Sequence, residues 1–184
     1  MKKIFGLIAV IILGMASFID ADAQNRLGIR YEGGQGVEQD YIEAARLFKL
    51  SAEQGHSKAQ VNLAVLYKDG KGVEQDYQKA LNLLQKADGK SAPLAHFYLG
   101  VFFLNGYGTP IDYEQAFEHF TQIAELGDPD VLYNIAYMYR NGLGREINIP
   151  EAIKWYKRAA EHGAYDALSI IGDIYKDGEG VPQD

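Results

Sequence analysis

The chain has 184 residues, of which 47% are hydrophobic and 23% are charged, a balance typical of a folded soluble domain rather than of a disordered chain or a membrane bundle. Its formal net charge of −7 predicts an acidic surface, which argues against a nucleic-acid or anionic-membrane partner. It contains no cysteine, which excludes disulfides, thiolate metal sites, a cysteine nucleophile and a lipid-attachment cysteine.

The N-terminus has the three-part pattern of a secretory signal. Lys2 and Lys3 precede an apolar run over 4–19, and Ala21-Asp22-Ala23 follows it. We predict cleavage after Ala23, so that 1–23 is a signal peptide. The alternative is an uncleaved anchor, because the apolar run approaches the roughly 20 residues that span a bilayer. Export without cysteines indicates a bacterial cell envelope, with the protein periplasmic or secreted.

Glycine pairs recur through the rest of the chain with a period of 36 residues. They stand at 34/36, 70/72, 106/108, 142/144 and 178/180. Upstream of each pair an aliphatic residue, a small residue and an aromatic residue have helical spacing, as in Leu27, Gly28 and Tyr31. This pattern predicts an amphipathic first helix that ends at the glycines, because glycine supplies the left-handed backbone that stops a helix.

A second helical pattern follows each glycine pair. An Asp or Asn precedes it as a predicted N-cap, at Asp40, Asp76, Asp112 and Asn148. Three residues later an acid or amide predicts capping boxes at Glu43, Gln115 and Glu151. Glycines then end the second helix, at Gly55, Gly127 and Gly163. The next first helix is expected from Ala59, Ala95, Val131 and Ala167.

Each unit is therefore helix, glycine turn, helix, and two such helices bury their apolar faces only by stacking on neighbours. The predicted fold is all-α, an α/α solenoid (superhelix) of helix-turn-helix repeats over 24–184. The predicted units are about 24–58, 59–94, 95–130 and 131–166, with a half unit at 167–184.

The unit resembles the Sel1-like repeat, a relative of the tetratricopeptide repeat. The family pattern runs Ala-x3-Leu-Gly-x2-Tyr, Gly-x-Gly-Val, Asp and then Ala-x3-Tyr-x2-Ala-Ala-x2-Gly. It is met by Ala59–Gly72 and, most fully, by Ala152–Gly163. The resemblance implies an exported interaction or adaptor protein that binds a peptide or protein, without enzyme activity or cofactor. One alternative is a β-lactam-binding or hydrolysing protein, but that related branch is cysteine-rich. Another is a fragment of a longer repeat protein.

Candidate chemical motifs give no catalytic or metal site. A phosphate loop needs its glycines between a strand and a helix, whereas here they join two helices. The histidines, which lack the spacing of a metal-binding pair, are His56, His96, His119 and His162. We interpret His56 and His162 as cations favoured at helix C-termini. No serine stands in a Gly-x-Ser-x-Gly or Ser-x-x-Lys pattern.

The segment between Lys90 and Arg140 is acidic and aromatic. It contains no Lys or Arg, and it holds half of the 22 aromatic residues. By analogy with tetratricopeptide units, the first helices line an inner groove whose middle is apolar. The candidate partner-binding residues are Val61, Val65, Phe97, Val101, Leu104, Tyr133, Tyr137 and Arg140. We expect a partner with an apolar anchor and basic flanks. The alternative is that these residues pack against the next unit.

The end of the chain lacks a predicted second helix. Ala167–Tyr175 form a first helix whose Leu168, Ile171 and Ile174 have none to meet. We expect this end to fray, to self-associate or to mark a truncation. The connection over 88–93 departs from the repeat pattern and is expected to be irregular.

Overall fold

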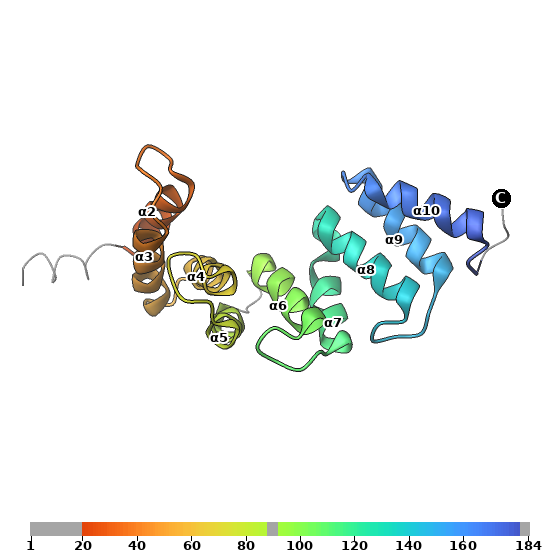
Figure 1. Cartoon of the computed structure of the whole chain (residues 1–184), viewed down its shortest axis with the longest axis horizontal. Coiled ribbons are helices and arrows are strands. Elements are labelled where there is room, and N and C mark those ends of the chain that lie inside the picture. The colour runs from red at the N-terminus through yellow and green to blue at the C-terminus, as the bar shows by residue number, and fades with distance from the viewer. Residues whose placement is uncertain (1–19, 88–91, 181–184) are drawn as a thin grey trace, which may run out of the picture. The chain divides into compact units, whose positions relative to one another are not determined.

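A computed structural model describes residues 20–87 and 92–180 (Figure 1). Within these ranges the chain forms nine α-helices and one short 3-10 helix and contains no strand, which confirms the all-α fold class. The apolar run of the predicted signal, residues 88–91 of the connection that was expected to be irregular, and the last four residues of the chain lie outside the described residues. No helix in the described ranges is long and apolar enough to cross a membrane. The contacts divide the chain into unit 1, up to Ala92, and unit 2, from Pro93 onward.

Unit 1 contains two helix pairs. Its helices are α2 (Ala21–Gly33), α3 (Tyr41–Glu53), α4 (Ser57–Asp69) and α5 (Tyr77–Ala87). α2 packs on α3 and α4 on α5, and α3 joins the two pairs through its contact with α4. Phe48 is fully buried between the pairs with Leu66, and the small residue Gly28 lies directly against the Phe48 ring.

Unit 2 repeats this arrangement and adds one helix. Its helices are α6 (Pro93–Asn105), α7 (Tyr113–Ile123), η1 (Ala124–Leu126), α8 (Pro129–Asn141), α9 (Ile149–Glu161) and α10 (Asp166–Asp177). α6 packs on α7, α7 on α8, α8 on α9, and α9 on α10. Phe120 is fully buried and its ring lies against Gly100, as Phe48 lies against Gly28. Each unit is thus a stack of helix pairs, as the 36-residue period predicts.

Both glycines of each described pair have left-handed backbone, with φ between 63° and 73°. The first glycine ends the helix: the Gly34 N–H donates to the Arg30 carbonyl, and the Gly70 N–H donates to the Leu66 carbonyl. The second glycine has a role that the sequence did not predict. A Cβ on Gly72 would lie 2.1 Å from the backbone oxygen of Tyr41, so the turn fits closely against the start of α3 in the preceding repeat.

The four predicted N-caps are confirmed, but the capping boxes are wrong. Each cap carboxylate or amide oxygen accepts a backbone N–H from the first turn of its helix, as Asp112 does from Gln115 at 3.0 Å. A capping box also needs the cap's own N–H to reach the third side chain. Here that N–H donates instead to the carbonyl of the aromatic residue in the preceding helix, as Asp112 does to Phe103 at 2.9 Å.

The first helices of the later repeats begin before the predicted alanine or valine. α4, α6 and α8 start two residues earlier, and α10 starts one residue earlier. The cap residues explain two of these starts, because His56 Nδ1 accepts from the Ala59 N–H at 3.2 Å and Asp128 accepts from two N–H groups of α8. His56 therefore follows the C-terminus of α3, as predicted, and also caps the beginning of α4, a role that the sequence did not predict.

The apolar residues of α10 are not equally exposed. Ile174 is fully buried, Ile171 is half-buried, and Leu168 remains 55% exposed. A Cβ on Gly172 would have nothing within 4 Å, although the same repeat position in α2 and α6 receives a Phe ring. The packing of α10 on α9 thus buries one of the three residues that were expected to lack a partner. Fraying and self-association stay predictions.

Candidate functional site

The eight candidate partner-binding residues divide between the two units. Val61 and Val65 lie on α4 in unit 1, and the other six lie on α6 and α8, the two complete first helices of unit 2. Val61 is only 1% exposed, because it faces the interior of its unit, so its inclusion is corrected. Val65 is half-buried. The six residues of unit 2 all keep some exposed surface, and Tyr137 is the most exposed of the aromatic ones at 42%.

The residues on α8 surround a buried phenol. The rings of Tyr133 and Tyr156 meet edge to face, with their centroids 5.3 Å apart. Burial, with the neighbouring Tyr133 as the next cause, raises the pKa of Tyr156 to about 12, so this phenol stays neutral. Arg140 donates from Nε to the Glu179 carboxylate at 2.9 Å, and that bond raises the Arg140 pKa. Tyr133 and Arg140 therefore have structural partners, whereas Tyr137 faces outward.

Phe97 lines an open cleft of about 390 Å³ in unit 2. We define this Phe97 cleft by six residues: Leu94, Phe97, Ile123, Leu126, Asp128 and Asp130. Leu94 and Leu126 are 51% and 65% exposed, so the cleft presents apolar surface to solvent. One Asp128 oxygen caps α8, while the exposed Asp130 follows in the first turn. The cleft thus combines an apolar surface with two carboxylates.

Leu94 and Leu126 line the cleft, although the sequence did not single them out as candidates. A signal for both was present in the repeats. Leu94 stands where Lys58 and Asp130 occur in the repeats on either side, and Leu126 stands where His162 occurs one repeat later and Gln54 two repeats earlier. An apolar residue at a position that is polar in the other repeats indicates a surface that differs from theirs.

The histidines include one close pair that sequence spacing did not reveal. His96 on α6 and His119 on α7 face each other with their Nδ1 atoms 3.0 Å apart, and the His119 ring stacks on Phe103. In the described part of the chain, no group of three or more His, Asp or Glu side chains is arranged to hold a metal ion. The pair is accounted for by the contact between α6 and α7 within one repeat.

Comparison with known proteins adds to this geometry. The family profile described as Sel1 repeat matches five segments, at 21–56, 57–87, 93–128, 129–163 and 166–184. A protective antigen of uropathogenic Escherichia coli strains, which displays an SLR fold, is 34% identical with a TM-score of 0.81. That match covers 89% of this chain and 35% of the antigen. A Sel1 repeat protein from Oxalobacter formigenes is 31% identical, also with a TM-score of 0.81. Here the match covers 90% of this chain and 66% of the relative.

A more distant likeness bears on the cysteine-rich branch. Helicobacter pylori cysteine rich protein B is 23% identical with a TM-score of 0.50, over 80% of this chain and 95% of that protein. This likeness shows a shared fold alone. No curated protein matches the chain. The chain spans about a third of the length of the E. coli antigen and about two thirds of the O. formigenes protein.

Proposed function

Because the chain belongs to the Sel1 repeat family, we propose that it is an exported adaptor that binds a peptide or protein through the first helices of unit 2. Sel1 repeats generally mediate protein interactions. The Phe97 cleft carries the proposal, since it exposes apolar side chains beside two carboxylates in a segment without Lys or Arg. The proposal includes no catalytic step and no cofactor.

The chemistry of the cleft specifies the partner's features. An apolar side chain of the partner would fill the space between Leu94 and Leu126, where burial of exposed apolar area stabilises the complex. Lys or Arg on either side of that anchor would face Asp128 and Asp130. The exposed ring of Tyr137 on α8 would extend the same binding surface.

The test is a crosslinking pull-down from an envelope fraction, followed by titration of the purified partner. Phe97→Ala and Tyr133→Ala are expected to abolish binding and to leave helicity intact. Tyr133 also packs on Tyr156, so Leu126→Ser, on an exposed side chain, is the cleaner variant. Ile42→Ser is the matched control, because Ile42 is an exposed aliphatic residue of unit 1. Equal binding by Leu126→Ser and Ile42→Ser would contradict the proposal.

Export is a separate part of the proposal and rests on the N-terminal sequence pattern. Cleavage after Ala23 would fall in the first turn of α2, and it would remove the Ala21 carbonyl that accepts from Ser51 Oγ at 2.6 Å. The mass of the protein from periplasm or culture medium distinguishes the outcomes. A mature chain that begins at Gln24 supports export with cleavage, and an intact Met1 in the membrane fraction supports an anchor.

A further inference from the structure

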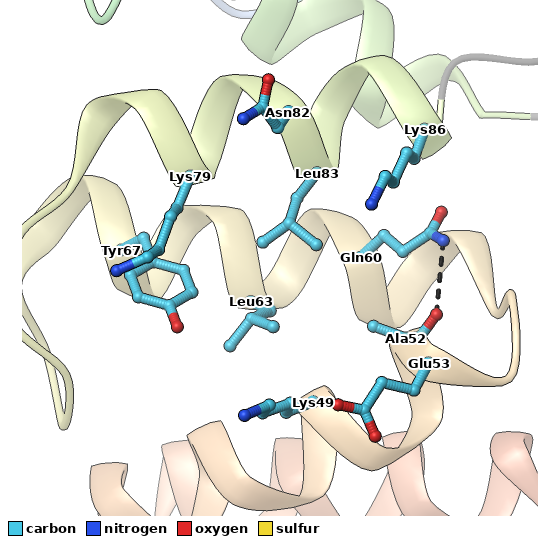
Figure 2. A pocket seen from close by; sticks show the side chains of 10 residues that line it. All are labelled: Lys49, Ala52, Glu53, Gln60, Leu63, Tyr67, Lys79, Asn82, Leu83 and Lys86. Atoms are coloured by element: carbon cyan, nitrogen blue, oxygen red, sulfur yellow. Dashed lines mark hydrogen bonds between the residues drawn. The ribbon is translucent and has the colours of Figure 1, made fainter.

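Unit 1 contains a second open pocket, of about 320 Å³, which shares no residue with the Phe97 cleft (Figure 2). Its two walls are second helices of adjacent repeats, α3 and α5, and its floor is the first helix α4 between them. Figure 2 shows Lys49 on the α3 side and Lys79 and Lys86 on the α5 side of this space. We call it the lysine pocket and define it by Lys49, Gln60, Leu63, Lys79, Leu83 and Lys86.

The lysine pocket is basic in a chain of net charge −7. Glu53 is the acidic residue that lines it, against three lysines. Lys79 is paired with Asp76 at 2.9 Å and lies over the Tyr67 ring. Among the described residues no ion pair joins Lys49 or Lys86 to a carboxylate, so two ammonium groups are available to a negatively charged ligand.

The equivalent place in unit 2 is built differently. A shift of 72 residues aligns Leu83 with Trp155, Lys86 with Arg158, and Glu53 with Glu125. Arg158 lies over the Trp155 ring and reaches Glu125 at 3.4 Å. Unit 2 thus has a larger ring where unit 1 has Leu83. It also has an ion pair at the positions of Lys86 and Glu53, for which unit 1 shows no ion pair among the described residues. The lysine pocket is therefore a local feature of unit 1 and not a consequence of the repeat.

The floor of the pocket carries an unsatisfied amide. Gln60 is 8% exposed, and its Nε2 donates to the Ala52 carbonyl at 3.4 Å (Figure 2, dashed line). Its Oε1 is buried and has no hydrogen-bond partner among the described residues. Unit 2 has Leu132 at this position, so the fold does not need an amide there. A buried acceptor without a donor is costly, and rotation of the Gln60 amide toward the pocket would let the N–H of a bound peptide supply that donor.

From these observations we propose that the lysine pocket binds an extended acidic peptide segment of another protein. Leu63 and Leu83 receive an apolar side chain, and the lysines pair with carboxylates on both sides of it. Lys79, whose ammonium would pair with the peptide in addition to Asp76, and Lys86 are two helical turns apart, about 10 Å along α5. Three residues of extended chain cover about 10 Å as well. The fitting sequence is therefore Glu-apolar-x-Glu, which spans a distance that a single small anion does not.

The test is fluorescence anisotropy of the full chain with a labelled Glu-Leu-Ser-Glu peptide. A Gln-Leu-Ser-Gln peptide is the matched ligand control. We expect saturable binding of the acidic peptide that weakens as salt rises, and binding of the neutral peptide weaker by on the order of tenfold. No binding of the acidic peptide, or equal binding of the two peptides, would overturn the proposal.

Variants of the protein distinguish binding in the lysine pocket from non-specific attraction between the peptide and the charge of the chain. Leu83→Trp introduces the side chain of position 155, and Lys86→Glu reverses one pocket charge, so each is expected to weaken binding on the order of tenfold. Lys157→Glu is the control, because it makes the same charge change on α9. Gln60→Leu is expected to weaken binding roughly fivefold while it stabilises the fold. Circular dichroism melting checks folding, and equal binding by Leu83→Trp and the wild-type chain would refute the assignment.

Discussion

In unit 1 the space between α3 and α5 is an open pocket with three lysines, whereas in unit 2 Trp155 and an Arg158–Glu125 pair stand at the matching positions. The two units nevertheless share one arrangement: the N–H of each N-cap residue joins the two helices of a repeat, and a glycine turn, at Gly72 in unit 1 and Gly144 in unit 2, fits against the preceding repeat of the same unit. The two units differ in side chains that take no part in these turns and caps. The repeats thus share their helix packing, while the pocket of unit 1 is lined by lysines and the cleft of unit 2 by aspartates.

The largest expected effect comes from substitutions in the glycine turns that both units share. Gly72→Ala would place a methyl group 2.1 Å from the Tyr41 oxygen, and Gly144→Ala would meet the Tyr113 backbone at 2.6 Å. We expect each to lower the free energy of unfolding by about 3 kcal/mol, measured by urea unfolding and circular dichroism. Gly55→Ala is the control, since it also has positive φ but nothing within 4 Å, and should cost about 1 kcal/mol. Equal losses at Gly55 and Gly72 would show that only φ matters.

A smaller effect is expected when Trp155 of unit 2 is replaced by leucine, the residue that unit 1 has at the matching position 83. Trp155→Leu removes apolar contact area and the ring under the Arg158 guanidinium. We expect a loss of about 1 to 2 kcal/mol in the free energy of unfolding, again by circular dichroism. Tyr165→Leu is the control, because Tyr165 is 74% exposed and should change stability little. If both variants were equally stable, Trp155 would not be packed as the structure describes.

Gln60→Leu gives unit 1 the residue that unit 2 has at the matching position, Leu132, and is expected to stabilise the fold. It removes the buried Oε1 that lacks a partner, which should raise the free energy of unfolding by about 1 kcal/mol. Gln24 occupies the same position one repeat earlier, but its Oε1 accepts from Gln54 at 2.7 Å. Gln24→Leu should therefore destabilise by about 1 kcal/mol. Changes of the same sign in both variants would contradict the account.

The smallest expected effect is the loss of helix stabilisation by the N-cap aspartates at low pH. Backbone N–H donation holds the pKa of Asp76 and of Asp112 below its usual range, with Lys79 and Gln115 as the main donors. A lowered folded-state pKa means that this stabilisation is present above the unfolded pKa of about 3.9 and is lost as pH falls through the folded value. Asp112→Asn should flatten the pH dependence of melting below about pH 4. If Asp112→Asn melted with the same pH dependence as the wild-type chain, the stability lost at low pH would come from other carboxylates.

Much of the frame could be predicted from the sequence because it repeats. The glycine spacing, the apolar spacing and the cap residues are local signals, and they place the helices to within about two residues. The second glycine's contact with the preceding repeat, the His96–His119 pair and the burial of Val61 depend on neighbours distant in the chain. Capping boxes failed because another helix's carbonyl competes for the cap N–H.

The proposed binding surfaces were harder to predict than the helices and their turns. Tyr137 and Phe97 were proposed from helical spacing and analogy; Tyr137 is exposed and Phe97 lines the cleft in unit 2, and their role in binding stays a prediction. Leu126 was missed because it lies in the short η1 helix, outside the first-helix pattern. The lysine pocket was missed because net charge averages over the chain, and its three lysines come from two different helices.

One measurement tests most directly whether the two units carry binding surfaces of opposite charge. Two peptides that differ only in charge, Glu-Leu-Ser-Glu and Lys-Leu-Ser-Lys, are titrated into the ¹⁵N-labelled chain while amide chemical shifts are followed. The account predicts that the acidic peptide shifts amides around Lys49, Gln60 and Leu83, and that the basic peptide shifts amides around Phe97 and Leu126. Shifts at the same residues with both peptides, or at neither set with either peptide, would contradict it.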